Sequence, residues 1–165
     1  TTASNTRTVP PSPPGSAAMQ ILIENRQRRC RWPSERIRAA AEIALNALGY
    51  PDAQLSILIV GDDRMAELNE TYLNHAGSTN VIAFPMQQGE FAGVTPNLLG
   101  DVVICADTAC READSAGMDA TERFNQLLVH GILHLVGYDH IHSETAAAAM
   151  ERKSDELMAL IGENA

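Results

Sequence analysis

The sequence predicts an α+β protein, a single compact domain in which a small mixed sheet of about four strands packs with about five helices. Three observations support this prediction. Short apolar runs of strand length are interspersed with longer segments whose apolar residues recur at helical spacing. Glycine, proline or a helix-capping residue separates most neighbouring segments. The length of 165 residues suits one domain with a sizeable core.

Residues 1–18 are expected to form a disordered tail, and residues 19–165 the single domain. The first 18 residues contain four of the eight prolines and almost no bulky apolar side chain. Such a segment buries too little surface to offset the entropy lost on ordering it. We therefore assign the tail no function.

The first three elements are expected to be a strand, a helix and a strand. Residues 20–23 form a short apolar run of strand type. After an arginine-rich turn, a helix opens at Pro33 and Ser34, carries apolar side chains at helical spacing and stops at Gly49. Apolar residues recur at every second position of residues 54–60, which predicts the second strand.

A short helix and two further strands are expected next. Asp62 follows the second strand and is predicted to be the N-cap of the short helix. Residues 80–84 predict a third strand closed by Pro85, and residues 98–104 predict the fourth. The stretch between these two strands contains glycines and a proline and is predicted to be a loop.

The last three elements are expected to be helices. Asp107 is predicted to cap the first of them. Asp119 with Glu122 resembles a capping box and starts the helix that carries the candidate metal site. Ser143 or Thr145 opens the final helix, in which apolar residues again repeat at helical spacing.

The net charge of −9, from 12 basic and 21 acidic residues, does not attract nucleic acid through the overall field of the protein. Residues 19–50 are an exception, because they hold six arginines against three acidic residues. If the protein binds RNA, we expect this segment to supply a local patch; a solvated turn and helix face is the alternative. The candidate RNA-binding residues are Arg26, Arg28, Arg29 and Arg31.

The other compositional features favour a cytoplasmic protein without a disulfide framework. The three cysteines form no CxxC pattern, so we expect them to be small buried apolar side chains. No apolar run approaches the ~20 residues that a membrane-spanning helix needs, and no signal peptide is recognised at the start of the sequence.

Residues 130–140 contain three of the five histidines and form the candidate metal site. His130 and His134 are four residues apart, a spacing that places both side chains on one face of a helix. Gly137 allows the chain to reverse and to bring back His140 as a third ligand. Three protein ligands leave a tetrahedral ion one open position for water, as in catalytic sites. Asp139 either orients a ligand imidazole or caps the turn.

This stretch resembles the signature of the YbeY family of bacterial rRNA-maturation endoribonucleases, His-Gly-x-Leu-His-Leu-x-Gly-Tyr-Asp-His, and matches it at every specified position. Residues 68–72, 78–85 and 100–104 are similar to further blocks of that family. The resemblance implies an α+β metalloprotein with a Zn²⁺-like ion on His130, His134 and His140, although imidazole also suits other transition metals. It further implies cleavage of single-stranded RNA, 16S rRNA 3′-end maturation and ribosome quality control, with the small ribosomal subunit and its associated factors as partners.

Two residues define the alternatives. The family commonly has an arginine near the metal where this chain has Leu73. A leucine cannot contact a phosphate as a cation does, so a ribosome-associated metalloprotein with weak or vestigial catalysis is one alternative. A metallopeptidase is the other, because zincins also place two histidines four apart. Their motif has a glutamate general base directly after the first histidine, where this chain has Gly131.

Overall fold

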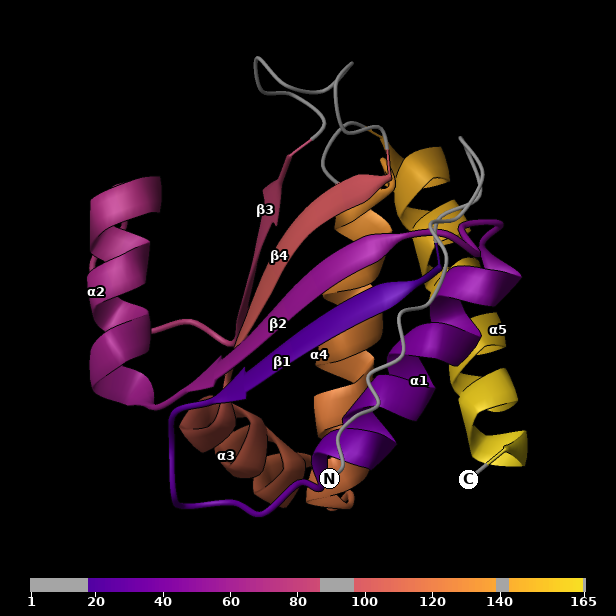
Figure 1. Cartoon of the computed structure of the whole chain (residues 1–165). Coiled ribbons are helices and arrows are strands. Elements are labelled where there is room, and N and C mark those ends of the chain that lie inside the picture. Colours follow the sequence, from indigo (N-terminus) through magenta and orange to yellow (C-terminus); the bar gives the residue numbers. More distant parts are fainter. Residues whose placement is uncertain (1–17, 87–96, 139–142, 165) are drawn as a thin grey trace, which may run out of the picture.

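The structure is a computed structural model, and it describes residues 18–86, 97–138 and 143–164. These residues form a single domain with a four-stranded mixed sheet and five helices (Figure 1). The predicted fold class is therefore confirmed. Residues 1–17 lie outside the described part, so the predicted tail remains a prediction.

The strands occur close to their predicted positions, and their order in the sheet is β1-β2-β4-β3. Their bounds are Gln20–Asn25 for β1, Gln54–Val60 for β2, Val81–Pro85 for β3 and Leu98–Cys105 for β4. Strands β1, β2 and β4 are parallel to one another, and β3 is antiparallel to β4. Strand β4 is thus an interior strand that is hydrogen-bonded on both sides.

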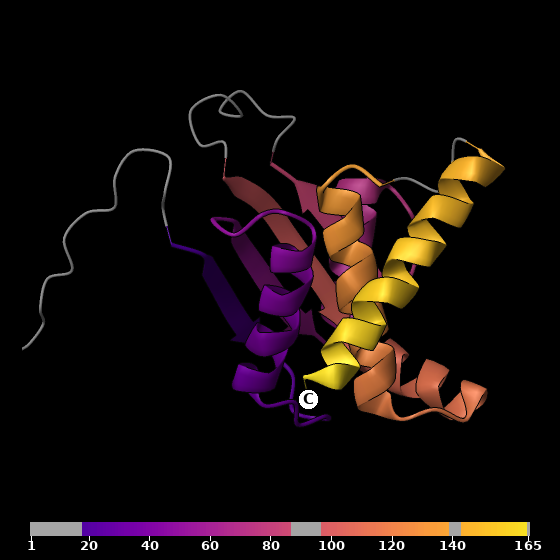
Figure 2. The same ribbon diagram turned by 90° about the vertical axis from the view of Figure 1, so that its right-hand side faces the viewer.

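The helices lie on both faces of the sheet. Their bounds are Ser34–Ala47 for α1, Asp62–Leu73 for α2, Ala106–Ala116 for α3, Ala120–Leu135 for α4 and Glu144–Glu163 for α5. Helices α1 and α4 cover one face, and α5 packs mainly on these two helices, farther from the sheet (Figures 1 and 2). Helix α2 lies on the other face, against β3 and β4. Helix α4 is therefore enclosed between the sheet and α5.

Two apolar clusters hold these layers together. The larger one joins the sheet to α1, α4 and α5, and in it the ring of Trp32 lies 4.4 Å from that of Phe124. The smaller one joins Met65 and Leu68 of α2 to the opposite face of the sheet. Within the described ranges, no helix has both the length and the apolar character needed to cross a membrane.

Two predicted helix caps are confirmed and two are wrong. The side chain of Asp119 accepts a hydrogen bond from the amide of Thr121 at the start of α4. The side chain of Ser143 accepts one from the amide of Ala146 at the start of α5. Asp62, however, is the first residue of α2 rather than its cap. Asp107 does not cap its own helix; its Oδ2 accepts a hydrogen bond from the amide of Asp62, 2.9 Å away. This carboxylate satisfies an unpaired amide of the neighbouring helix, a tertiary contact that local sequence cannot reveal.

Candidate metal centre

Helix α4 carries one polar stripe on an otherwise largely buried surface. Half of its sixteen residues are buried. Arg123, Gln126, His130 and His134 are half-buried and follow one another at helical spacing. At about 100° per residue, these four side chains fall within about 80° of arc around the helix axis. The first three of these side chains line a pocket between the start of β3 and α5, and the two histidines line a cleft beside β3. Sequence reasoning identified the two histidines but missed Arg123 and Gln126, although the same periodicity marks them.

The two histidines form a compact pair. Their Nε2 atoms are 3.1 Å apart, and their rings lie at 77° to each other. Two Zn–N bonds of about 2.0–2.1 Å at a tetrahedral angle would place the nitrogens about 3.3 Å apart. The donor atoms of His130 and His134 therefore fit one shared ion with only a small adjustment. Their role as ligands remains a prediction.

The pair opens into a cleft of about 500 Å³ between α2, β3 and α4. Both histidines line it, together with Val81 and Ile82 of β3 and Leu73 at the end of α2. Leu73 is 43% exposed, so a longer side chain at this position has room to reach into the cleft. Among the residues that the structure describes, no arginine or lysine lines this cleft.

The chain turns sharply where α4 ends. Gly137 has a φ of +104°, a region that favours glycine, and the amide of Tyr138 donates to the carbonyl of Leu133 over 2.9 Å. The predicted glycine-mediated end of this helix is thus confirmed. Asp139 and His140 lie outside the described residues. The described residues contain no group of three potential ligands, so the third ligand also remains a prediction.

Gly131 has a structural role that the sequence did not reveal. A Cβ atom at this position would lie 2.7 Å from Cγ1 of Val102 and 3.3 Å from Cγ2 of Val81. Such contacts are shorter than the ~3.5–4.0 Å at which carbon atoms pack favourably. Helix α4 therefore lies close against the sheet at its first histidine, and the glutamate of a zincin motif has no space there.

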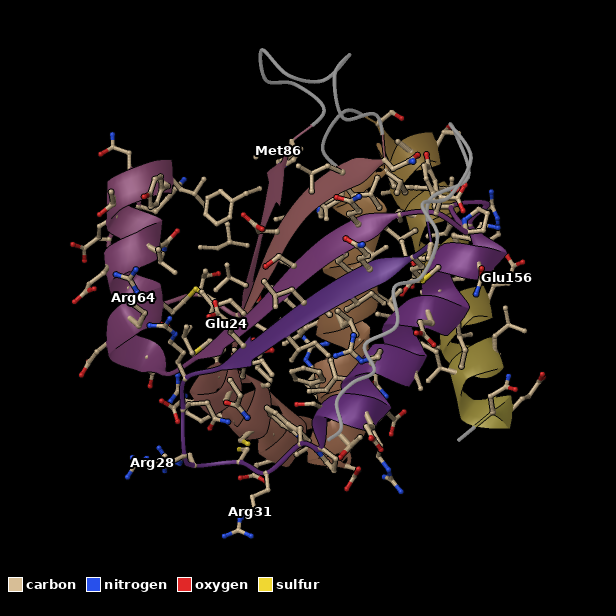
Figure 3. All side chains as sticks on the ribbon, in the orientation of Figure 1. Glu24, Arg28, Arg31, Arg64, Met86 and Glu156 are labelled. Atoms are coloured by element: carbon tan, nitrogen blue, oxygen red, sulfur yellow. The ribbon has the colours of Figure 1, made fainter. Side chains whose placement is uncertain are left out.

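The candidate RNA-binding arginines are not brought together with the histidines. They lie in the loop between β1 and α1, where Figure 3 shows Arg28 and Arg31 projecting outward. Arg31 lines a pocket with Thr121, at the beginning of α4. Thirteen residues separate Thr121 from His134, a distance of about 20 Å along a helix. One RNA strand that contacts both regions would have to span that distance.

Two arginines of this end of the molecule are engaged with carboxylates. Arg29 pairs with Asp107 at 3.2 Å, and Arg111 binds both carboxylate oxygens of Asp62 at 2.8 and 3.0 Å. The hydrogen bonds from Arg111 hold the pKa of Asp62 well below its usual range. The pair of Arg111 with Asp62 ties α3 to α2, and the pair of Arg29 with Asp107 ties the loop before α1 to α3, so both contacts have a structural role.

The cysteines show no sign of reactivity. Cys105 is buried, and Cys30 and Cys110 pack against the larger apolar cluster. Burial, with the adjacent Cys110, raises the pKa of Cys30 to about 12. Cys30 is therefore a neutral thiol at physiological pH, which makes it a poor nucleophile.

Comparisons with known proteins agree on one family. The model of the family described as endoribonuclease YbeY matches residues 22–162. The chain is 48% identical over 144 residues to Endoribonuclease YbeY of Geobacter metallireducens, which covers 87% of this chain and 96% of the relative. The protein of the same name from Aquifex aeolicus is 43% identical over 121 residues, 73% of this chain and 77% of the relative.

One solved structure has a similar fold. The solution structure of TM1509 from Thermotoga maritima matches with a TM-score of 0.62, over 87% of this chain and 91% of that one. The two sequences are 21% identical, so this likeness concerns the fold alone.

Proposed function

Since the chain belongs to the YbeY endoribonuclease family, we propose that it is a metal-dependent endoribonuclease that cuts single-stranded RNA. We further propose that it acts in the cytoplasm on 16S rRNA, in 3′-end maturation and ribosome quality control. Its partners there would be the small ribosomal subunit and associated factors. The observation that carries the proposal is the pair of imidazole nitrogens 3.1 Å apart at the wall of an open cleft.

His130 and His134 would hold the ion, with His140 as the third ligand and Asp139 as the residue that orients a ligand imidazole. Zn²⁺ is the expected ion, because three neutral imidazoles suit it and leave one position open. When bound, the ion supplies Lewis-acid catalysis and lowers the pKa of a water molecule toward neutrality. The apolar side chains of Leu73 and Val81 would limit the access of bulk water to this part of the cleft.

A metallopeptidase is disfavoured by the packing around the first histidine. The residue after His130 is a glycine whose missing Cβ would lie 2.7 Å from Val102. No general base can occupy this position, and a glutamate there would displace the helix that positions both histidines.

Weak catalysis is the alternative that one observation favours. Leu73 lines the cleft beside the histidines, where an arginine could contact a phosphate. With leucine at this position, the transition state lacks that cation. A ribosome-associated metalloprotein with low activity is therefore the second candidate function.

Metal content and RNA cleavage test the proposal together. The wild-type protein should hold about one equivalent of metal by elemental analysis and should cut single-stranded RNA but not casein. His130→Ala and His134→Ala should lose both properties. His75→Ala is the matched control, because His75 is exposed and does not line the cleft, and it should keep the metal. A full equivalent of metal in His134→Ala would contradict the ligand assignment.

A further inference from the structure

A second pocket adjoins the histidine cleft on the other side of His130. It has a volume of about 270 Å³ and lies between the start of β3, the polar stripe of α4 and one face of α5. Val81 and His130 line both this pocket and the cleft, so the two share part of their walls. Any strand whose phosphate reaches His130 would place a neighbouring nucleoside beside this pocket.

The ion pair between Arg123, which lines the pocket, and Glu112 fixes two amide side chains. Arg123 pairs with Glu112 at 2.8 Å and donates from Nη1 to Oε1 of Gln126 over 2.7 Å. Asn80 donates from Nδ2 to the carboxylate of Glu112 at 3.2 Å. A guanidinium only donates and a carboxylate only accepts, so the orientation of both amides is determined.

The two amides therefore present complementary groups to the pocket. Asn80 retains its carbonyl oxygen as an acceptor, and Gln126 retains its NH₂ group as a donor. Within the described part of the chain, neither of these atoms has a hydrogen-bonding partner that would occupy it. A donor and an acceptor that line the same pocket can pair with the Watson–Crick edge of an unpaired base, the feature by which single-stranded RNA is read.

The remaining walls suit a base rather than a phosphate. Leu127, Val81 and Met158 supply apolar surface for the face of a ring. The charge of Arg123 is balanced by Glu112, and Asp155 adds a further negative charge at the rim. An anion would meet no excess positive charge here. The volume is just below the ~300–1,000 Å³ typical of sites for drug-sized ligands, which fits a single nucleoside.

From these contacts we propose that the pocket is a nucleoside-binding subsite, in which Asn80 and Gln126 recognise the edge of a base next to the phosphate that is cut. The Glu112–Arg123 ion pair positions these two amides. The inference rests on the proposed RNA-cleaving function and adds to it a determinant of base preference.

Gln126→Glu is the test substitution. It replaces the donor that faces the pocket by an acceptor, while it preserves the side-chain length and the hydrogen bond from Arg123. Asn125→Asp is the matched control, since it adds the same charge at the adjacent residue of α4, which lines a different pocket next to α1. Both variants are compared with the wild type in two assays.

The first assay is fluorescence anisotropy of labelled RNA hexamers of A, C or U, measured in the His134→Ala background so that no cutting occurs. Gln126→Glu should change the affinity ratio between the best-bound and worst-bound hexamer about tenfold, the size expected for one base-edge contact. Asn125→Asp should leave this ratio unchanged. The second assay maps the cleavage sites in a single-stranded RNA of mixed sequence, where Gln126→Glu should alter the base found beside the cut.

Equal base preference in Gln126→Glu and Asn125→Asp, in both assays, would overturn the subsite. If Gln126→Glu fails to fold by circular dichroism, Gln126→Ala removes the donor without adding charge, and an unchanged preference in that variant would overturn it equally. If Gln126→Glu changes the base preference in binding but the wild type cuts no RNA, the subsite is supported and the proposed activity is refuted. If the wild type cuts RNA and neither variant changes the base preference, the proposed activity is supported and the subsite is refuted.

Discussion

Replacement of Gly131 by alanine should destabilise the protein, although alanine is the better helix former. In an exposed helix, this change stabilises by about 1 kcal/mol. Here the new Cβ would lie 2.7 Å from Val102 Cγ1 and 3.1 Å from Cγ2. Favourable carbon contacts need about 3.5 Å or more, so the helix and the sheet would have to separate by about 0.8 Å.

The surroundings of Val102 leave little room for that separation. Val102 is fully buried on β4, which is hydrogen-bonded to β2 on one side and to β3 on the other. Overpacking of a rigid core costs about 1–3 kcal/mol, or more. After subtraction of the gain in helix propensity, we expect Gly131→Ala to lower the free energy of unfolding by up to about 2 kcal/mol.

Urea unfolding followed by circular dichroism measures this change as a lower midpoint at constant slope. Gly162→Ala is the matched control: it lies in α5, its Cβ would meet no atom within 4 Å, and it should stabilise slightly. In the Val102→Ala background the clashing methyl groups are absent, so Gly131→Ala should cost at least about 1 kcal/mol less there. The reasoning is refuted if Gly131→Ala stabilises the wild type as Gly162→Ala does.

Three further predictions concern the cleft and the helix ends. Leu73→Arg should raise the rate of single-stranded RNA cleavage about tenfold. A guanidinium in the cleft can bind phosphate with a charge-assisted hydrogen bond worth about 1.5–3 kcal/mol. The control variant Leu73→Met adds no charge and should leave the cleavage rate unchanged. Asp62→Asn should lower the free energy of unfolding at pH 7, measured by urea unfolding, by no more than about 1 kcal/mol, since the Asp62 side chain is 36% exposed. The pKa of Asp62 is depressed in the folded state, so its stabilisation is present above the unfolded pKa of about 3.9 and is lost on acidification below it. The difference in the free energy of unfolding between wild type and Asp62→Asn should therefore shrink below about pH 4. A difference that grows there would contradict the assignment. Asp119→Ala should cost about 1 kcal/mol in the same assay by removing the cap of α4, and an unchanged midpoint would show that this cap does not contribute.

Features that depend on local sequence were predictable. Period-two alternation located residues 54–60 as β2, with bounds that the structure reproduces. The four-residue spacing placed His130 and His134 on one face of α4, and Asp119 was identified as the cap of that helix. In each case the interacting groups lie within one turn of helix or on one strand, so the pattern alone determines the outcome.

Features that depend on contact with a second helix or strand were not predictable from the sequence. Asp107 caps α2 instead of its own helix, because the amide it satisfies comes from a residue 45 positions away. Gly131 is required by Val102 of β4, and nothing in the helix sequence indicates that close approach. The pairing of Arg123 with Glu112 depends likewise on how α3 meets α4. Partners of this kind are set by topology, and the orientation of Asn80 and Gln126 follows from them.

X-ray absorption at the zinc edge, on protein loaded with one equivalent of Zn²⁺, tests the central claim most directly. If His130, His134 and His140 hold the ion, the first shell contains three imidazole nitrogens at about 2.0–2.1 Å and one non-protein oxygen. In His134→Ala this imidazole signal should be lost. Sulfur scattering at about 2.3 Å, or an imidazole signal that persists in His134→Ala, would show that the ion is held elsewhere and would contradict the proposed site.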